Sequence, residues 1–184
     1  MKLSELEILV LPGLGGGSDG YWYRRWAAKL STARIIEQGN WDSPLQDEWV
    51  NTICDTVAEA KKPVFFIAHS LGTIALAHAA AKLTDANIVG AFLVAIPDLE
   101  MIEKQYPAVG DFLPTPTGPL PFPSLVLASQ NDPYCEYPAA ENISLDWGAS
   151  LVDAGHYGHL NEDSGHGPWP EGLMALSKFL NQLG

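Results

Sequence analysis

The serine at position 70 has neighbours that would let its hydroxyl act as a nucleophile. Residues 63–68, which precede it, form an apolar run with β-branched and aromatic members, and this run predicts a buried strand. Residues 73–83, which follow it, are rich in alanine and leucine and predict a helix. A serine in a sharp turn between a strand and a helix forms a nucleophile elbow, which lifts the hydroxyl clear of the sheet edge. The alternative is a serine that only caps the helix.

The turn needs small residues two positions before and two positions after the serine, because the strand and the helix approach closely there. Ala68 and Gly72 occupy these positions. The usual pattern has glycine at both positions. Here alanine, the next smallest residue, replaces the first glycine at position 68. A serine placed in this way would attack an acyl carbonyl.

A serine hydroxyl is inert at neutral pH unless a base takes its proton and an acid orients that base. In sheets with such an elbow, the acid and then the base follow the serine along the chain, each on a loop after a strand. Asp132 follows the predicted strand 124–128 and is the candidate acid. Its rival is Asp98, which follows the predicted strand 88–96. The alternative for Asp132 is a plain Asn-Asp-Pro turn.

The candidate bases are His156 and His159, which both follow the last predicted strand and cannot be separated by spacing alone. His166 lies further along, near the start of the final helix. We expect structural roles for His69, which adjoins the serine and should point away from it, and for His78 on the elbow helix. A weaker alternative is a metal cluster, although its spacing matches no known metal site. That cluster would comprise His156, His159, Asp163 and His166.

Strands and helices alternate along the chain. Strands are predicted over residues 8–11, 33–36, 63–68, 88–96, 124–128 and 150–152. Helices are predicted over residues 20–30, 46–60, 73–83, 139–146 and 173–183. Since nearly all the strands are apolar, this order indicates a three-layer α/β fold, a mostly parallel sheet with helices on both faces. We expect a single domain over residues 1–184 without a large lid.

Residues 97–123 form a segment with seven prolines and no convincing strand. It leaves the carboxyl end of a predicted strand, where open α/β sheets bind their ligands. We therefore expect it to form one wall of a substrate pocket, with Met101, Tyr106 and Phe112 as lining residues. The alternative is a surface loop stiffened by proline.

Composition narrows the classes of function and partner. The 184 residues are 47% hydrophobic and 17% charged, as in ordinary globular proteins. Ten basic and 22 acidic residues give a net charge of −12, which argues against nucleic acid and anionic membrane surfaces as partners. The two cysteines form no disulfide framework, and no signal peptide or transmembrane run is recognisable. We expect a soluble, cytoplasmic protein.

Several motifs together resemble the small lidless serine hydrolases of the α/β-hydrolase fold, a family that includes the retinoblastoma-binding-protein type and many bacterial members. The resemblance covers essentially the whole chain. Its motifs are Leu11-Pro12-Gly13, Ala68-His69-Ser70-Leu71-Gly72, Asn131-Asp132-Pro133, Gly158-His159-Leu160-Asn161 and Trp169-Pro170-Glu171-Gly172. It implies a triad of Ser70, Asp132 and His159, and so favours His159 over His156. The Leu-x-Cys-x-Glu peptide that binds retinoblastoma protein is absent, so no such partner is expected.

The triad predicts a serine hydrolase that cleaves small carboxylic esters or related acyl substrates such as thioesters and activated amides. We expect a small-molecule acyl substrate and no cofactor or metal. Backbone N–H groups of Leu71 and Leu14 should form the oxyanion hole, because one follows the nucleophile and the other lies in the glycine-rich loop after the first strand. The alternatives are a non-catalytic binding protein on a hydrolase scaffold and a dinucleotide-binding domain. The latter would use residues 15–20, which match G-x-G-x-x-G, with Glu37 after the next strand.

Overall fold

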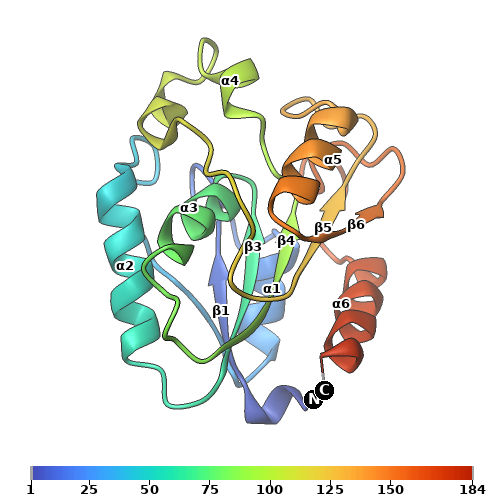
Figure 1. Ribbon diagram of the computed structural model, residues 1–184. Helices are drawn as coiled ribbons and strands as arrows, with labels where there is room; N and C mark the ends of the chain where they lie inside the picture. Colours follow the sequence, from blue (N-terminus) through green and yellow to red (C-terminus); the bar gives the residue numbers. More distant parts are fainter. Residues whose placement is uncertain (1, 184) are drawn as a thin grey trace.

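The computed structural model describes residues 2–183. Six parallel strands form one sheet in the order β2-β1-β3-β4-β5-β6 (Figure 1). The strands are β1 (Glu7–Leu11), β2 (Ala33–Ile35), β3 (Val64–His69), β4 (Ile88–Val94), β5 (Ser124–Ala128) and β6 (Ser150–Asp153). The longer helices are α1 (Trp22–Lys29), α2 (Gln46–Ala58), α3 (Leu71–Ala80), α5 (Tyr137–Asp146) and α6 (Pro170–Gln182). Three short helices complete the fold, namely η1 (Leu3–Glu5), α4 (Leu99–Ile102) and η2 (Pro107–Phe112).

Each face of the sheet is covered by helices (Figure 1). Successive residues of a strand point to opposite faces, so β1 contributes Leu9 and Leu11 to one core and Ile8 and Val10 to the other. The first core includes buried side chains of α2, α3 and α5, and the second includes those of α1 and α6. Burial on both faces explains why the central strands are almost wholly apolar.

The strand order reverses between β1 and β3. From β1 the chain runs outward to β2, and from β3 it runs the other way through β4 and β5 to β6. The loops after β1 and β3 therefore leave the sheet side by side at its carboxyl edge, which is where open α/β sheets bind ligands. Ser70 directly follows β3, and Leu14 lies in the loop after β1.

The three-layer α/β architecture expected from the sequence is confirmed, and the predicted strands and helices lie within a few residues of the observed ones. The sequence pattern did not reveal η1, α4 or η2; the last two lie in the proline-rich segment 97–123. Within residues 2–183, no separate lid domain covers the carboxyl edge of the sheet. No helix in the described chain combines the length and the apolar character needed to cross a membrane.

Candidate active site

Ser70 has the backbone conformation of a strained turn, with φ 53° and ψ −130°. A non-glycine residue adopts this conformation only where the surrounding structure enforces it. The Ser70 N–H donates to the carbonyl oxygen of Val94 at 3.0 Å, and both the N–H and the hydroxyl of Thr73 donate to the carbonyl oxygen of Ser70. These bonds hold the peptide groups on both sides of Ser70 and place its side chain in the cavity described below.

Close backbone packing explains the small residues around the turn. A methyl group on Gly72 would collide with the carbonyl oxygen of Leu11 and lie 2.6 Å from that of Pro12. A methyl group on Gly13 would lie 2.7 Å from Cβ of Ser70. The glycine requirement therefore comes from the loop after β1, which lies directly against the turn, whereas the methyl group of Ala68 fits in the core.

His159 and Asp132 form a hydrogen-bonded pair. Nδ1 of His159 lies 2.9 Å from Oδ1 and 2.8 Å from Oδ2 of Asp132, and both side chains are buried. Because a carboxylate can only accept hydrogen bonds, the proton lies on Nδ1 of His159, which donates a hydrogen bond to Asp132. The N–H of Tyr134 also donates to Oδ1 of Asp132, at 2.9 Å, and fixes the carboxylate from the other side. Within the described chain no hydrogen bond joins His159 to the hydroxyl of Ser70, and such bonds commonly tighten only when substrate is bound.

Side chains from the sheet and from α1 hold the backbone around His159. His69 donates from Nε2 to the carbonyl oxygen of His159 at 3.0 Å, and the indole of Trp22 donates to that of Leu160 at 2.8 Å. Leu160 has φ 49°, which is unfavourable for a branched side chain, so these two bonds stabilise a strained loop. Burial, with the neighbouring imidazole of His159 as a second cause, lowers the pKa of His69 to about 3 and keeps the ring neutral.

A further network joins the loop that carries Asp132 to the loop that carries His159. Oδ1 of Asn131 accepts the N–H of Gly158 and the hydroxyl of Ser129, each at 2.9 Å. The hydroxyl oxygen of Ser129 accepts the N–H of Tyr157 at 2.9 Å. The two loops are thus tied together at several points, which fixes the position of the imidazole relative to the carboxylate.

The rival candidates have other surroundings. The carboxylate of Asp98 accepts the N–H of Met101 and caps α4, so it serves a short helix. His156 is exposed, and the buried ring of His166 lies 3.2 Å from the hydroxyl of Ser164. Nowhere in residues 2–183 do three or more histidine, cysteine or acidic side chains form a group that could hold a metal ion.

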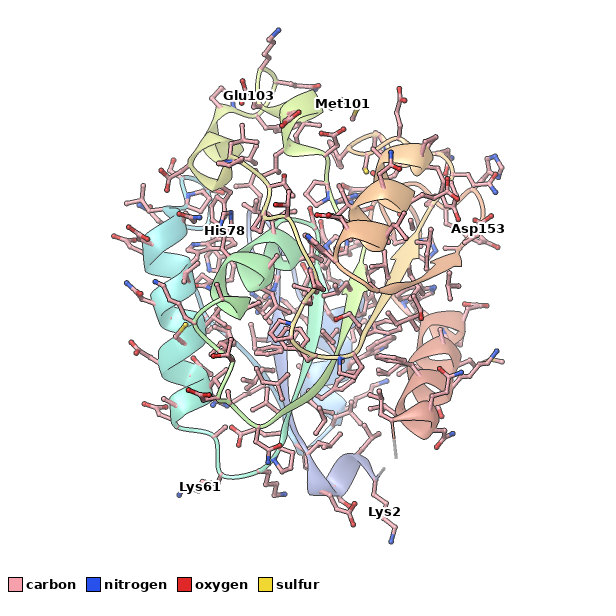
Figure 2. All side chains as sticks on the ribbon, viewed as in Figure 1. Lys2, Lys61, His78, Met101, Glu103 and Asp153 are labelled. Carbon is pink, nitrogen blue, oxygen red and sulfur yellow. The ribbon has the colours of Figure 1, made fainter. Side chains whose placement is uncertain are left out.

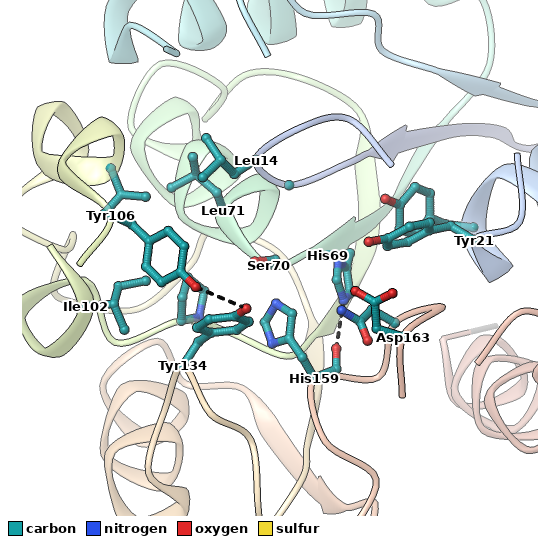
Figure 3. A pocket seen from close by; sticks show the side chains of 15 residues that line it. Leu14, Tyr21, His69, Ser70, Leu71, Ile102, Tyr106, Tyr134, His159 and Asp163 are labelled. Atoms are coloured by element: carbon teal, nitrogen blue, oxygen red, sulfur yellow. Dashed lines mark hydrogen bonds between the residues drawn. The ribbon is translucent and has the colours of Figure 1, made fainter. Parts of the chain in front are cut away.

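A cavity of about 180 Å³ brings Ser70 and His159 together at the carboxyl edge of the sheet (Figure 3). The other lining residues are Gly13, Leu14, Tyr21, Tyr23, His69, Leu71, Pro97, Ile102, Tyr106, Val109, Tyr134, Asn161 and Asp163. Segment 97–123 does form one wall, as expected from the sequence, and Tyr106 is part of it. The expectation was wrong for two residues. Met101 lies at the outer surface (Figure 2), and Phe112 is packed in the core against Trp49.

Leu14 and Leu71 both line the cavity, as a shared oxyanion hole requires. The hydrogen bonds described for residues 2–183 give neither backbone N–H an acceptor. A methyl group on Gly13 would lie 3.2 Å from the nitrogen of Leu71, so the two loops meet at this point. Both N–H groups are therefore available at the same end of the cavity.

The glycine-rich loop after β1 differs from a dinucleotide-binding loop. Ten residues separate the end of β1 from the start of α1. The hydroxyl of Ser18 donates to the carboxylate of Glu162 at 2.5 Å, and this carboxylate also lies against Gly20. A negative charge thus occupies the place where such a loop would hold a phosphate. Glu37 pairs with Arg24 at 3.7 Å.

Sequence reasoning did not identify several residues of the site. Tyr21 and Tyr23 reach the cavity from the start of α1, and Tyr134 packs edge-on against the ring of His159 with centroids 4.6 Å apart. Of these three tyrosines, only Tyr134 could have been suspected from the sequence, because it lies two residues after the candidate acid Asp132. Asn161 ends the motif Gly158-His159-Leu160-Asn161 and Asp163 lies two residues beyond it, but the sequence does not show that either residue faces the cavity.

Comparison with known proteins places these observations in a family. A model of the family described as serine hydrolase matches residues 8–178. YdeN of Bacillus subtilis, named as a candidate hydrolase, is 23% identical over 186 residues, which cover 96% of this chain and 97% of YdeN. The crystal structure of YdeN superposes with a TM-score of 0.80 at 20% identity and covers 96% of this chain and 99% of that one.

Two further solved structures support the same fold. A YdeN-like candidate hydrolase from Pectobacterium atrosepticum has a TM-score of 0.85 and 30% identity, over 98% of this chain and 93% of its own. Est1E of Butyrivibrio proteoclasticus, solved with ferulic acid bound, has a TM-score of 0.69 at 13% identity, over 97% and 88% of the two chains. At that identity the likeness shows the α/β-hydrolase fold alone. The extent of the family match and the fold lead to one conclusion: this chain belongs to the serine hydrolase family.

Proposed function

We propose that this hydrolase cleaves small carboxylic esters through an acyl-enzyme on Ser70, with His159 as the general base and Asp132 as the residue that orients it. The observation that carries the proposal is that His159, which lines one cavity with Ser70, forms a buried hydrogen bond with Asp132. Since Nδ1 of His159 donates to Asp132, Nε2 is left unprotonated and can accept the proton of the serine hydroxyl.

The reaction proceeds in two halves. Oγ of Ser70 attacks the ester carbonyl while its proton passes to Nε2 of His159, and the tetrahedral intermediate collapses as His159 returns that proton to the leaving alcohol. Water then attacks the acyl-enzyme, His159 takes a proton from it, and the carboxylic acid leaves as Ser70 regains its proton. Asp132 stays ionised and stabilises the imidazolium that forms in each half.

Backbone N–H groups of Leu14 and Leu71 would bind the developing oxyanion. Both lie at the end of the cavity nearest Ser70, and within the described chain neither has another acceptor. Loss of one such donor typically costs on the order of 3 kcal/mol in transition-state stabilisation. Because the donors belong to the backbone, they are fixed before substrate binds.

The size of the cavity supports the choice of small esters. A volume of about 180 Å³ beside Ser70 suits a short acyl group and a compact alcohol. Pro97, Ile102, Tyr106 and Val109 give one wall an apolar surface that suits such a group.

The test is a series of 4-nitrophenyl esters with acyl chains from two to twelve carbons. We expect the highest kcat/KM for the short chains, and a burst of nitrophenol equal to one per chain where deacylation is slow. Ser70→Ala should abolish both, whereas Ser43→Ala, which changes an exposed serine, should leave them unaltered. Tight binding of esters without any turnover would instead favour a binding protein on a hydrolase scaffold.

A further inference from the structure

The two sides of the cavity differ in chemistry (Figure 3). On one side of Ser70 lie Leu14, Ile102 and Tyr106, which form a largely apolar wall. On the opposite side lie Tyr21 and Asp163, next to His69. A substrate that spans Ser70 therefore places one of its groups against apolar side chains and the other near a carboxylate.

Asp163 is the only acidic residue among the fifteen that line the cavity, and no lysine or arginine lines it. The hydrogen bonds and ion pairs of residues 2–183 give the Asp163 side chain no partner. Its neighbour Glu162, by contrast, is engaged by the hydroxyl of Ser18. Asp163 is exposed, so water screens its charge in part, but no cation of the described chain pairs with it at a position that bound substrate would reach.

The turn that carries Asp163 is fixed by its own hydrogen bonds. Oδ1 of Asn161 accepts the N–H of Ser164 at 3.0 Å, and the carbonyl oxygen of Asn161 accepts the N–H of His166 at 2.9 Å. The N–H of Asn161 donates to the hydroxyl oxygen of Ser164 at 2.9 Å. The backbone at Asp163 is therefore held in place before a ligand binds, which reduces the entropy lost on binding.

Aromatic rings lie on the same side as Asp163. The ring centroids of Tyr21 and Tyr23 are 5.2 Å apart, and that of Tyr23 lies 5.5 Å from that of His69. His69 is neutral, so it adds no positive charge to oppose a cation. Faces of aromatic rings attract cations, most strongly where water is partly excluded.

The electrostatic influence of Asp163 extends to both walls. Burial is the main cause that raises the pKa of Tyr21, and the charge of Asp163 is the next. On the other wall, the hydrogen bond with Tyr106 is the main cause that raises the pKa of Tyr134 to about 12, and Asp163 contributes to it. The carboxylate of Asp163 thus acts on tyrosine hydroxyls of both walls.

We propose that Asp163, with the partly exposed ring of Tyr21, forms a cation subsite, and that the preferred substrates are esters with an ammonium group on this side and an apolar group on the other. The assignment of these substrates rests on the proposed function, whereas the cation subsite stands without it. The net charge of −12 agrees with such a preference, because it attracts cationic substrates and repels anionic ones.

The preference is tested with two esters of the same shape. Butyrylcholine and 3,3-dimethylbutyl butyrate differ in that a quaternary nitrogen replaces a carbon. We expect kcat/KM to be about fivefold higher for the cation at low ionic strength, which is the size of effect that a partly exposed charge pair produces. The advantage should shrink as salt is added.

Asp163→Asn should remove the advantage, so that the ratio of kcat/KM for the cationic ester to kcat/KM for the neutral ester falls to about one. The matched control is Glu59→Gln, which removes one exposed carboxylate at the end of α2 and alters net charge equally. The Glu59→Gln variant should keep the preference for the cationic ester. A preference that is the same in Asp163→Asn and in the wild type would overturn the proposal.

Direct binding separates this inference from the proposed reaction. Calorimetry on the Ser70→Ala variant should detect butyltrimethylammonium, and the additional change Asp163→Asn should weaken its binding about fivefold. If the cation binds in a way that depends on Asp163 but the wild type hydrolyses no ester, the subsite is supported and the proposed reaction is wrong. Equal affinity in the two variants would reject the subsite, whatever the activity.

Discussion

Nε2 of His69 donates a hydrogen bond of 3.0 Å to the backbone carbonyl oxygen of His159. The two residues are 90 positions apart in the chain, and their ring centroids lie 4.9 Å from each other. His69 is the last residue of β3 and directly precedes Ser70. The end of β3 thus positions both candidate residues, because Ser70 directly follows it and its last residue, His69, holds the backbone of His159. The geometry of the turn at Ser70 is therefore coupled to that of the loop that carries His159.

This bond predicts a positioning role for His69. His69→Phe keeps a ring but leaves the buried carbonyl oxygen of His159 without a donor, so the free energy of unfolding should fall by about 1–3 kcal/mol. The loss of orientation should lower kcat by about tenfold or more with little change in KM. His69→Gln retains a donor and should recover much of kcat. Identical kcat values in the phenylalanine and glutamine variants would contradict this role.

The same residue predicts a pH dependence of stability. Burial lowers the pKa of His69 in the folded state to about 3, against 6.5 in the absence of burial. Between these values the unfolded chain binds a proton that the folded chain excludes, so stability falls as pH decreases from 6.5 towards 3. His69 alone should lower the free energy of unfolding by up to about 1.4 kcal/mol for each pH unit in this range.

Urea unfolding at several pH values measures this dependence. His69→Phe lacks the titrating group and should show a shallower decrease over the same range. Burial also lowers the pKa values of His78 and His166, so part of the decrease should remain in that variant. Equal slopes in the wild type and in His69→Phe would show that His69 is not the group responsible.

Asp132 and Asp98 should respond differently to substitution. Asp132→Asn disturbs the hydrogen bond with Nδ1 of His159 and should lower kcat about a thousandfold or more. Asp98→Ala removes the cap of α4 and should cost about 1 kcal/mol of stability while kcat stays within about twofold. Steady-state kinetics and thermal unfolding of both variants show which of the two aspartates acts in catalysis and which stabilises a helix. A reversed pattern would make Asp98 the functional acid.

Close packing of glycine predicts a severe effect at position 72. Gly72→Ala would drive a methyl group into the backbone of Leu11 and Pro12, which cannot move without disturbing β1, and should destabilise the fold by about 3 kcal/mol or more. Gly110→Ala is the matched control, since an added methyl group there meets nothing within 4 Å. Chemical denaturation should show a large loss in the first variant and almost none in the second.

Local sequence patterns were sufficient for the sheet and for the order of the candidate residues. Apolar runs such as 64–68 are long enough to mark buried strands. Ser70 directly follows β3, and Asp132 lies four residues after the end of β5. The choice of His159 over His156 came from a resemblance, because spacing did not separate them. In the structure His159 is buried against Asp132 whereas His156 is exposed, and the assignment of His159 as the base stays a prediction.

Contacts between distant segments could not be read from the sequence. Prolines concealed α4 and η2, and an apolar side chain such as Phe112 fits a core as well as a pocket wall. The bond between His69 and His159 depends on how β3 meets the last loop, which local periodicity does not encode. The sequence offered Asp163 only as a ligand of the alternative metal cluster, and its place in the cavity wall emerges only from the structure.

Covalent labelling of Ser70 with a fluorophosphonate, followed by intact mass measurement, tests most directly whether this serine is activated by His159. We expect one adduct on the wild type, no adduct on Ser70→Ala, almost none on His159→Ala and an undiminished adduct on His156→Ala. An unlabelled but well-folded wild type would contradict an activated serine, and labelling that depends on His156 would contradict the assigned base.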